Sequence, residues 1–443
     1  MTKLLGFRPQ SHRQVFTIAL PMVVSNIAAP MLGLVDTAII GHLPQSIYLS
    51  GVALGAMIVS FIYLLAVFLR MTTTGVVAQA QGARDDSQLQ AFIQHGAWFA
   101  LGLGLLLWLA KPLLLELAWW LTQPEAALKA QAALYIEIRL WAAPAALFNL
   151  VVLGVLLGLK RSRQAMLLVI FTNAVNVAGD LIFIIGLDLT VAGAAWASVL
   201  AEVATALLGA WLLMRHANWR WQWQLQLPLL QRLMGMNRDV FIRSLVLQLC
   251  LATMTGYATR FGHEVVAANA VLMQFLLLIS LGLDGLAYAV EALVGHAKGA
   301  RQERRIRYWF GLTLIWSGLF ALAYSLIFAV FGAQIIAALT DITSIRQTAE
   351  HYLGWLIILP LLAHWSYAYD GLFIGLSWTK AMRNTMLAAA LLGFVPIWLG
   401  VILSDLSNEN ANHGLWLALS VFLLSRGVAQ AIFTARQPRF AKP

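Results

Sequence analysis

Charged residues are scarce in this chain. Only 11% of its 443 residues are charged and 61% are apolar, whereas a soluble globular chain carries about 25% charged residues. Apolar runs of membrane-spanning length recur from one end of the sequence to the other. The composition therefore excludes an ordinary soluble protein and indicates a polytopic membrane protein.

Several chemical signatures are also missing. The single cysteine, Cys250, falls inside a predicted span and excludes an intramolecular disulfide. There is no P-loop GxxxxGK[ST], no HExxH and no GxSxG, and the nine histidines show no metal-ligand spacing. We therefore expect no enzyme, no catalytic residue, no resident metal, no organic cofactor and no ATP-driven pump within this chain. A short basic N-terminus without a small-residue cleavage site predicts a retained first helix.

The apolar runs predict an all-α protein with twelve membrane spans. Several exceed the roughly 20 residues that a straight span needs, so tilted spans or extensions into water are expected. The predicted spans are 14–40, 48–80, 92–118, 132–158, 165–187, 190–214, 238–261, 265–297, 307–331, 352–376, 384–403 and 413–434.

Lysine and arginine are distributed unevenly between the connections. Those on one side hold most of them, and those on the other hold only Lys111, Lys129 and Arg346. Because cytoplasmic connections are enriched in lysine and arginine, both termini are expected in the cytoplasm. This placement accounts for the formal charge of +10 without a nucleic-acid partner.

The two halves of the chain repeat. Gly82-Ala83-Arg84 returns as Gly299-Ala300-Arg301, and Gly154 returns as Gly371, both at an offset of 217. Since each half has an even number of spans, the halves enter from the same side and form two six-helix bundles related by a pseudo-twofold along the membrane normal. We predict an N-lobe at 1–214, a cytoplasmic linker at 215–237 and a C-lobe at 238–443.

The first span carries one ionisable side chain, Asp36, between Val15 and Ile40. A carboxylate inside a bilayer costs about 2.5–3.5 kcal/mol on insertion scales and marks a functional-site hypothesis. Pro21 and Pro30 interrupt the same helix and predict a hinge. A bendable helix with one buried acid suits a protonation switch, although a buried acid that only joins two helices explains Asp36 equally well.

The fifth span places Asn173, Asn176 and Asp180 on one helical face, at steps of three and four. Asp180 and Asp36 are predicted at similar depth in the first half. Two neighbouring carboxylates do not readily ionise together, so this pair is the predicted proton-binding site. The alternative is a hydrogen-bond network that only stabilises the lobe.

The second half has its own intramembrane acids: Asp284 and Glu291 in the eighth span and Asp370 in the tenth. Arg70, in the second span, lies near the repeat position of Asp284. We interpret these charges as structural ion pairs between the halves, with a gate that breaks in one conformation as the other hypothesis.

The motifs ALPMVVSN and LVDTAIIGHL of the first span and TNAVNVAGDLIF of the fifth resemble the multidrug and toxic compound extrusion (MATE) transporters. FLRMTTTG and LDGLAYAVEA resemble the DinF-like branch. The resemblance covers essentially the whole chain. It implies a monomeric, cation-coupled antiporter of a bacterial inner membrane that exports amphipathic, cationic drugs. It also implies that Asp36, Asn176 and Asp180 carry the coupling.

The NorM-like branch uses acids in helices seven and ten. Asp370 matches the second of these, but span seven has no acid beyond Asp239 at its cytoplasmic end. This departure favours H⁺, with Na⁺ as the alternative coupling ion. One alternative is a transporter of lipids or other metabolites from the same superfamily, and another is a channel or scaffold. A third is a facilitator of the major superfamily, but the basic loop that usually follows the second span of such proteins is replaced here by QGARDDSQ.

Overall fold

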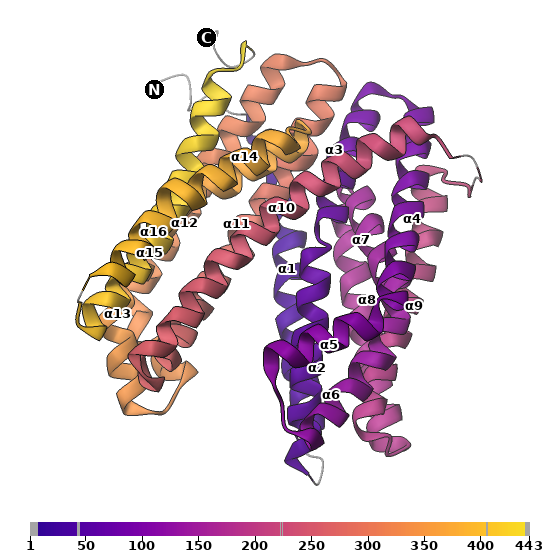
Figure 1. Ribbon diagram of the computed structural model, residues 1–443. Helices are drawn as coiled ribbons and strands as arrows, with labels where there is room; N and C mark the ends of the chain where they lie inside the picture. Colours follow the sequence, from indigo (N-terminus) through magenta and orange to yellow (C-terminus); the bar gives the residue numbers. More distant parts are fainter. Residues whose placement is uncertain (1–7, 42–44, 222, 224, 405, 439–443) are drawn as a thin grey trace. The chain divides into compact units, whose positions relative to one another are not determined.

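The computed structural model describes residues 8–41, 45–221, 223, 225–404 and 406–438, and this part of the chain contains helices and no strands. Figure 1 shows their course along the chain. The helices of the first half are α1 (Pro9–Ile40), α2 (Ser46–Leu65), α3 (Phe68–Ala83), α4 (Asp86–Leu109), α5 (Lys111–Thr122), α6 (Ala126–Arg139), η1 (Leu140–Ala142), α7 (Ala143–Gly158), α8 (Ser162–Asp180), η2 (Leu181–Gly186) and α9 (Thr190–Ala217). Those of the second half are α10 (Leu227–Ala258), η3 (Thr259–Phe261), α11 (His263–Gly299), α12 (Glu303–Leu339), α13 (Thr343–Gly375), α14 (Thr379–Ala389), η4 (Ala390–Phe394), α15 (Val395–Leu403) and α16 (Asn408–Ala435).

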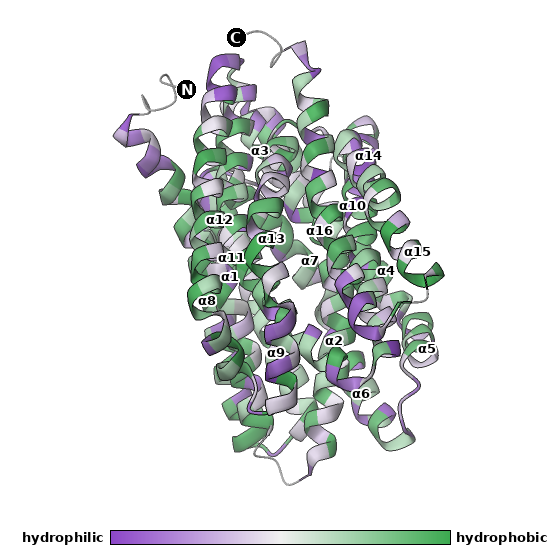
Figure 2. Cartoon of the chain, turned by 90° about the vertical axis from the view of Figure 1, so that its left-hand side faces the viewer, coloured by the Kyte–Doolittle hydropathy of each residue, from purple (hydrophilic) through white to green (hydrophobic). Residues whose placement is uncertain are grey.

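Within the described residues, 12 helical segments are long and apolar enough to cross a membrane, which confirms the predicted spans. Apolar segments, drawn in green, recur along the helices in Figure 2. Large apolar side chains such as Leu106, Leu207 and Leu326 remain exposed on the protein itself, as expected where a helix meets lipid rather than water.

Two predicted boundaries differ from the structure. The third span, predicted over 92–118, ends at Leu109, and the separate helix α5 follows from Lys111. Pro112 stands in the first turn of α5 and lacks the N–H that would continue the preceding helix. The seventh span begins at Leu227 rather than 238, so the second part of the predicted linker is the first part of α10.

The chain forms two compact units. The first unit is Val24–Asn237, and the second unit is Met1–Val23 together with Arg238–Pro443. This grouping differs from the predicted lobes at the N-terminus because the start of α1 packs with the second unit. There Val15, Ile18 and Ala19 join a buried apolar cluster with residues of α11 and α12. The later part of α1 belongs to the first unit, where Ile40 is buried beside Val52 and other apolar residues.

The repeat is visible in the backbone of both units. Arg84 and Arg301 adopt left-handed conformations, with φ of 55° and 56°, at the ends of α3 and α11. Lys160 and Ser377 do the same after α7 and α13, with φ of 59° and 53°. Both pairs are 217 residues apart. Non-glycine residues rarely adopt this conformation, so its return at one offset supports a common architecture for the two halves.

The same offset describes one helix crossing in each unit. A Cβ on Gly154 of α7 would lie 2.6 Å from the carbonyl oxygen of Arg70 on α3, and a Cβ on Gly371 of α13 would lie 2.5 Å from that of Ala287 on α11. Each glycine begins a G-x-x-x-G sequence that ends at Gly158 or Gly375. Small residues at this spacing allow two backbones to approach closely within a membrane.

Candidate functional site

The helix α8 brings three polar side chains to one face because Asn173, Asn176 and Asp180 follow its periodicity. A π-helix, η2, begins at Leu181, directly after Asp180. Short π segments inside longer helices often occur at functional sites. The corresponding span of the second half also contains a π-helix, η4, but the residues 217 positions after the three polar ones are Ala390, Gly393 and Ile397. Each of the two spans thus contains a π-helix, but at different repeat positions, and the polar face of α8 does not return in the second half.

Two carboxyl groups meet in the first unit. The side chains of Asp36 on α1 and Asp180 on α8 hydrogen-bond each other. Asp180 is only 1% exposed. A hydrogen bond between two carboxyl groups needs a proton on one of them, because an ionised carboxylate only accepts. The pair is therefore placed where the predicted proton-binding site requires it, and its proton-binding role stays a prediction.

Asn176 connects this pair to α9. Its amide is assigned with the nitrogen facing Asp36, where it donates to Oδ1 over 3.1 Å. The amide oxygen then accepts from the backbone N–H and the hydroxyl of Ser198, at 3.2 and 3.0 Å. Asn176 is 3% exposed, so its amide acts in a largely dehydrated position and orients Asp36 as a hydrogen-bond acceptor.

Asn173 provides a second tie between α8 and α1. Its Nδ2 donates to the backbone oxygen of Ala28 over 2.8 Å. Ala28 lies between the two prolines of α1, Pro21 and Pro30, within one continuous helix. The four predicted polar residues are thus brought together, and they fasten the later part of α1 to α8. Their role in coupling and the role of the prolines as hinges stay predictions.

A second polar cluster of the first unit is formed around Arg139 and Glu202. Arg139 Nη2 lies 4.0 Å from Glu202 Oε1, and Asn149 Nδ2 donates to Glu202 Oε2 over 2.7 Å. The guanidinium of Arg139 also lies over the ring of Tyr63, 5.7 Å from its centroid. The charge of Arg139 acts on Asp36 as well. This cluster therefore contributes a positive field beside the acid pair.

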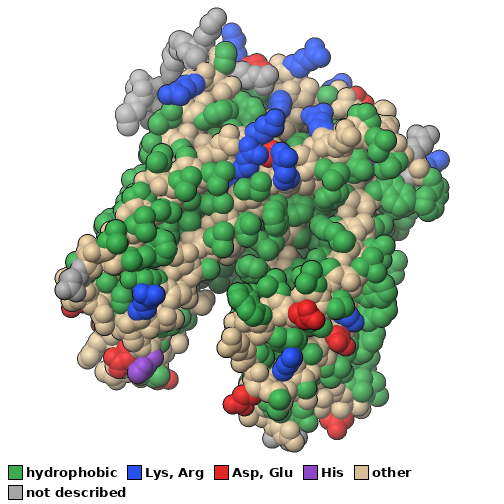
Figure 3. Space-filling view, viewed as in Figure 1, with side chains coloured by type: hydrophobic (Ala, Val, Ile, Leu, Met, Phe, Trp, Pro, Cys, Tyr) green, Lys and Arg blue, Asp and Glu red, His purple; other side chains and the backbone are tan. Residues whose placement is uncertain are grey.

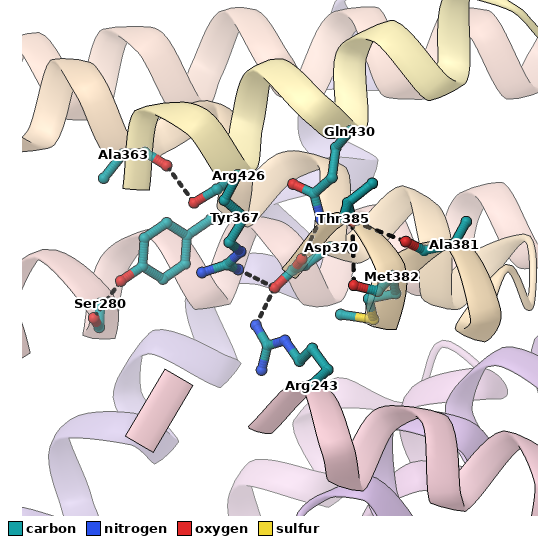
Figure 4. Close-up of polar contacts among 11 residues, drawn as sticks. Arg243, Ser280, Ala363, Tyr367, Asp370, Ala381, Met382, Thr385, Arg426 and Gln430 are labelled. Carbon is teal, nitrogen blue, oxygen red and sulfur yellow. Dashed lines mark hydrogen bonds and ion pairs between the residues drawn. The ribbon is translucent and has the colours of Figure 1, made fainter. Parts of the chain in front are cut away.

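Figure 4 shows the main polar cluster of the second unit, around Asp370. Its Oδ2 pairs with both Arg243 of α10 and Arg426 of α16, and its Oδ1 accepts from Gln430 Nε2 over 2.7 Å. The Arg426 side chain is 3% exposed. Both carboxylate oxygens are occupied by donors, and two guanidinium groups share the one carboxylate of Asp370.

The sequence alone did not reveal this cluster. Arg243 and Arg426 fall within the predicted spans 238–261 and 413–434, but the sequence does not show that they share a partner. A charge inside a membrane needs an opposite charge or a polar cavity. The two arginines therefore indicate that an acidic residue of another span, such as Asp370, is a candidate partner. The seventh span therefore contributes a cation to this site, while its one acid, Asp239, pairs with Arg383 over 2.7 Å.

The remaining predicted charges lie in separate units. Arg70 is buried on α3 of the first unit, whereas Asp284 and Glu291 lie on α11 of the second, with Glu291 buried. An ion pair or gate between the halves stays a prediction.

Comparison with known proteins identifies the family. The MatE family model matches residues 21–182 and again 240–399, which is more than half of the chain and one match in each half. The chain is 40% identical to the DNA damage-inducible protein F of Escherichia coli K12, over 98% of this chain and 94% of that protein. It is 25% identical to the multidrug resistance protein PmpM of Pseudomonas aeruginosa, over 96% of this chain and 92% of that protein.

The fold also matches solved structures. One is the outward-facing conformation of a multidrug resistance MATE family transporter of the MOP superfamily, with a TM-score of 0.84, 20% identity and coverage of 96% of this chain and 95% of that one. At this identity the likeness concerns the fold. Together with the family match and the full-length relative, it shows that the chain is a multi-pass membrane protein belonging to the MATE family of multidrug and toxic compound extrusion transporters.

Proposed function

We propose that this protein is a proton-coupled antiporter that exports amphipathic, cationic compounds across a bacterial inner membrane by alternating access. The observation that carries the proposal is the hydrogen-bonded pair of Asp36 and Asp180, which joins the proline-containing helix α1 to α8. H⁺ is the coupling ion, no other cofactor takes part, and the transporter works as a monomer with both termini in the cytoplasm. The name multidrug resistance protein of the relative PmpM supports a drug-like substrate.

The proposed switch begins with the charge on the acid pair. With one shared proton the pair carries a negative charge, which the amide of Asn176 and the field of Arg139 stabilise. Uptake of a second proton removes that charge. Hydrogen bonds to charged groups contribute about 1.5–3 kcal/mol each, so their weakening is enough to shift a two-state balance of a few kcal/mol.

Movement of α1 follows from this change. With Asp36 neutral, the later part of α1 is held less firmly to α8 and can bend at Pro21 or Pro30, whose nitrogens form no helix hydrogen bond that would have to break. The boundary between the two units falls after Val23, close to Pro21. We propose that bending of the part of α1 that follows Val23 displaces the substrate outward, and that deprotonation restores the straighter helix.

The occupation of Asp370 supports H⁺ over Na⁺. A sodium ion needs several free oxygen ligands, whereas both oxygens of Asp370 accept from arginine or glutamine. The acid pair of the first unit therefore remains as the coupling site in this proposal.

A second candidate function rests on the same cluster. Arg243 and Arg426 share the single carboxylate of Asp370. Two guanidinium groups at one place favour a substrate with an anionic group, as a lipid or another charged metabolite would have. Under this alternative the chain is a transporter of the same family whose substrate carries a negative charge.

The test uses everted membrane vesicles and an imposed gradient. A pH gradient should drive accumulation of a fluorescent cationic dye, and Asp36→Asn should abolish it, while Asp341→Asn, an exposed acid far along the chain, should behave as wild type. Transport that follows a sodium gradient at constant pH, without response to a pH gradient, contradicts proton coupling. Competition by anionic but not by cationic amphiphiles favours the second candidate.

A further inference from the structure

Two histidines and a glutamate converge at one end of the second unit. Glu409 and His413 are four residues apart near the start of α16 and so share a face, and His351 comes from the start of α13. His351 Nε2 lies 2.9 Å from Glu409 Oε1 and 3.2 Å from His413 Nε2. All three ligand atoms lie within 4.8 Å of one another. Histidine appears beside acidic side chains at this end of the unit in Figure 3.

No placement of protons on the two imidazole rings gives every one of these contacts a hydrogen-bond donor and an acceptor. The indole N–H of Trp355 donates to His413 Nδ1 over 2.9 Å, so the neutral ring of His413 carries its proton on Nε2. That N–H faces His351 Nε2, which must then be an acceptor. The Glu409 carboxylate, also an acceptor, lies against the same nitrogen. If His351 Nε2 is protonated instead, it satisfies Glu409 but faces the N–H of His413. One of the two contacts therefore fails in either assignment while Glu409 is ionised.

A metal cation resolves this conflict. It accepts lone pairs from imidazole nitrogen and carboxylate oxygen at once, and bond lengths of about 2.0–2.2 Å in a tetrahedral site place the ligand atoms about 3.3 Å apart. The two distances from His351 Nε2, 2.9 Å to Glu409 and 3.2 Å to His413, are close to that size, and all three ligand atoms lie within 4.8 Å of one another. Two imidazoles and one carboxylate match Zn²⁺ and related transition metals, whereas Ca²⁺ and Mg²⁺ prefer oxygen ligands alone.

We propose that His351, Glu409 and His413 form a binding site for one divalent transition-metal ion of the Zn²⁺ class. The ion joins the beginning of α13 to the beginning of α16, with water in the fourth position. This site is separate from the acid pair of the first unit and does not depend on proton coupling.

Trp355 sets the affinity of the site. His351 and Glu409 can bind the ion without rearrangement, but His413 must move its proton from Nε2 to Nδ1, where the indole N–H of Trp355 now points. Each bound ion therefore costs the Trp355 hydrogen bond. A phenylalanine at this position keeps an aromatic ring and removes the competing N–H, so it frees His413 as the third ligand.

The experiment is a Zn²⁺ titration of the purified, untagged protein in detergent, after chelator treatment, against a chromophoric competitor. We expect one ion per chain, with binding weakened at least tenfold in His351→Ala and Glu409→Gln and tightened in Trp355→Phe. His263→Ala removes an exposed histidine of the same unit that is outside this cluster and should leave the affinity unchanged. The proposal is overturned if His351→Ala and Glu409→Gln both bind Zn²⁺ as tightly as the wild type. It is also overturned if neither the wild type nor Trp355→Phe binds Zn²⁺ more tightly than these two variants.

Thermal unfolding gives a second readout that does not require transport. A ligand that binds only the folded state raises its unfolding temperature. Zn²⁺ should therefore raise the unfolding temperature of the wild type and of His263→Ala, and should have no such effect on His351→Ala. The unfolding temperatures without metal show whether each variant is folded, so that a loss of binding is not confused with a loss of structure.

Discussion

The carboxyl groups of Asp36 and Asp180 hydrogen-bond each other across α1 and α8. This contact gives each acid a different set of neighbours. Asp36 receives the amide of Asn176 and the field of Arg139, while Asp180 is almost completely buried. Under the proposed function the two acids act as one coupled unit, so a change at either residue should alter the other.

The first prediction concerns these acids. Asp36→Asn keeps the shape of the side chain but cannot carry a proton, so proton-driven efflux should be lost while expression and folding remain. Asp180→Asn should have a similar or slightly milder effect. Drug resistance in cells and dye efflux in everted vesicles measure the change, with Asp341→Asn as control. Full resistance in cells that express Asp36→Asn contradicts the role assigned to this residue.

The second prediction concerns the charge balance around Asp370. Asp370→Asn leaves the guanidinium groups of Arg243 and Arg426 without their anion. Breaking a buried ion pair by removing one partner costs about 3–5 kcal/mol, so the unfolding temperature should fall clearly. Arg243→Gln leaves one arginine for one carboxylate and should cost less. Thermal unfolding in detergent compares the two, and a greater loss in Arg243→Gln than in Asp370→Asn contradicts this account.

The third prediction uses the repeated helix crossing. A methyl group on Gly154 or Gly371 would meet a backbone oxygen at 2.6 or 2.5 Å, so α3 and α7, or α11 and α13, must move apart. Overpacking of this kind costs about 1–3 kcal/mol. Gly154→Ala and Gly371→Ala should therefore lower the unfolding temperature by similar amounts. Gly102→Ala is the matched control, because its added Cβ meets open space. Equal behaviour of all three variants contradicts the close crossing.

Much of this architecture could be predicted from the sequence, and the reasons are physical. Membrane spans are recognisable from their length and composition. The repeat is visible in the sequence because Gly154 and Gly371 occupy equivalent helix crossings, one in each unit. The polar face of α8 follows from helical periodicity. The partners of Asp370 could not be predicted, because Arg243 and Arg426 come from two other helices and periodicity does not tell which helices pack together. The convergence of His351 with His413, across 62 residues, could not be predicted for the same reason.

The last prediction concerns how protonation becomes movement. If the charge on Asp36 holds the later part of α1 against α8, the distance between the two helices should depend on pH. Leu34 on α1 and Leu167 on α8 are 65% and 58% exposed and lie in the same unit. Both can carry spin labels through cysteine substitutions in a Cys250→Ser background, since Cys250 is the single native cysteine.

Distance distributions would be compared at about pH 5 and about pH 8, so that the coupled pair is sampled with more and with fewer protons bound. We expect a longer or broader distribution in acid, because a neutral Asp36 loses its charge-assisted bond from Asn176. In Asp36→Asn the distribution should be the same at both values, and in Pro21→Ala the acid-induced change should shrink if that proline is the hinge. A wild-type distribution that ignores pH, or an equal response in Asp36→Asn, excludes Asp36 as the switch. A change that persists in Pro21→Ala moves the hinge to Pro30, which lies between the Ala28 contact and the acid itself.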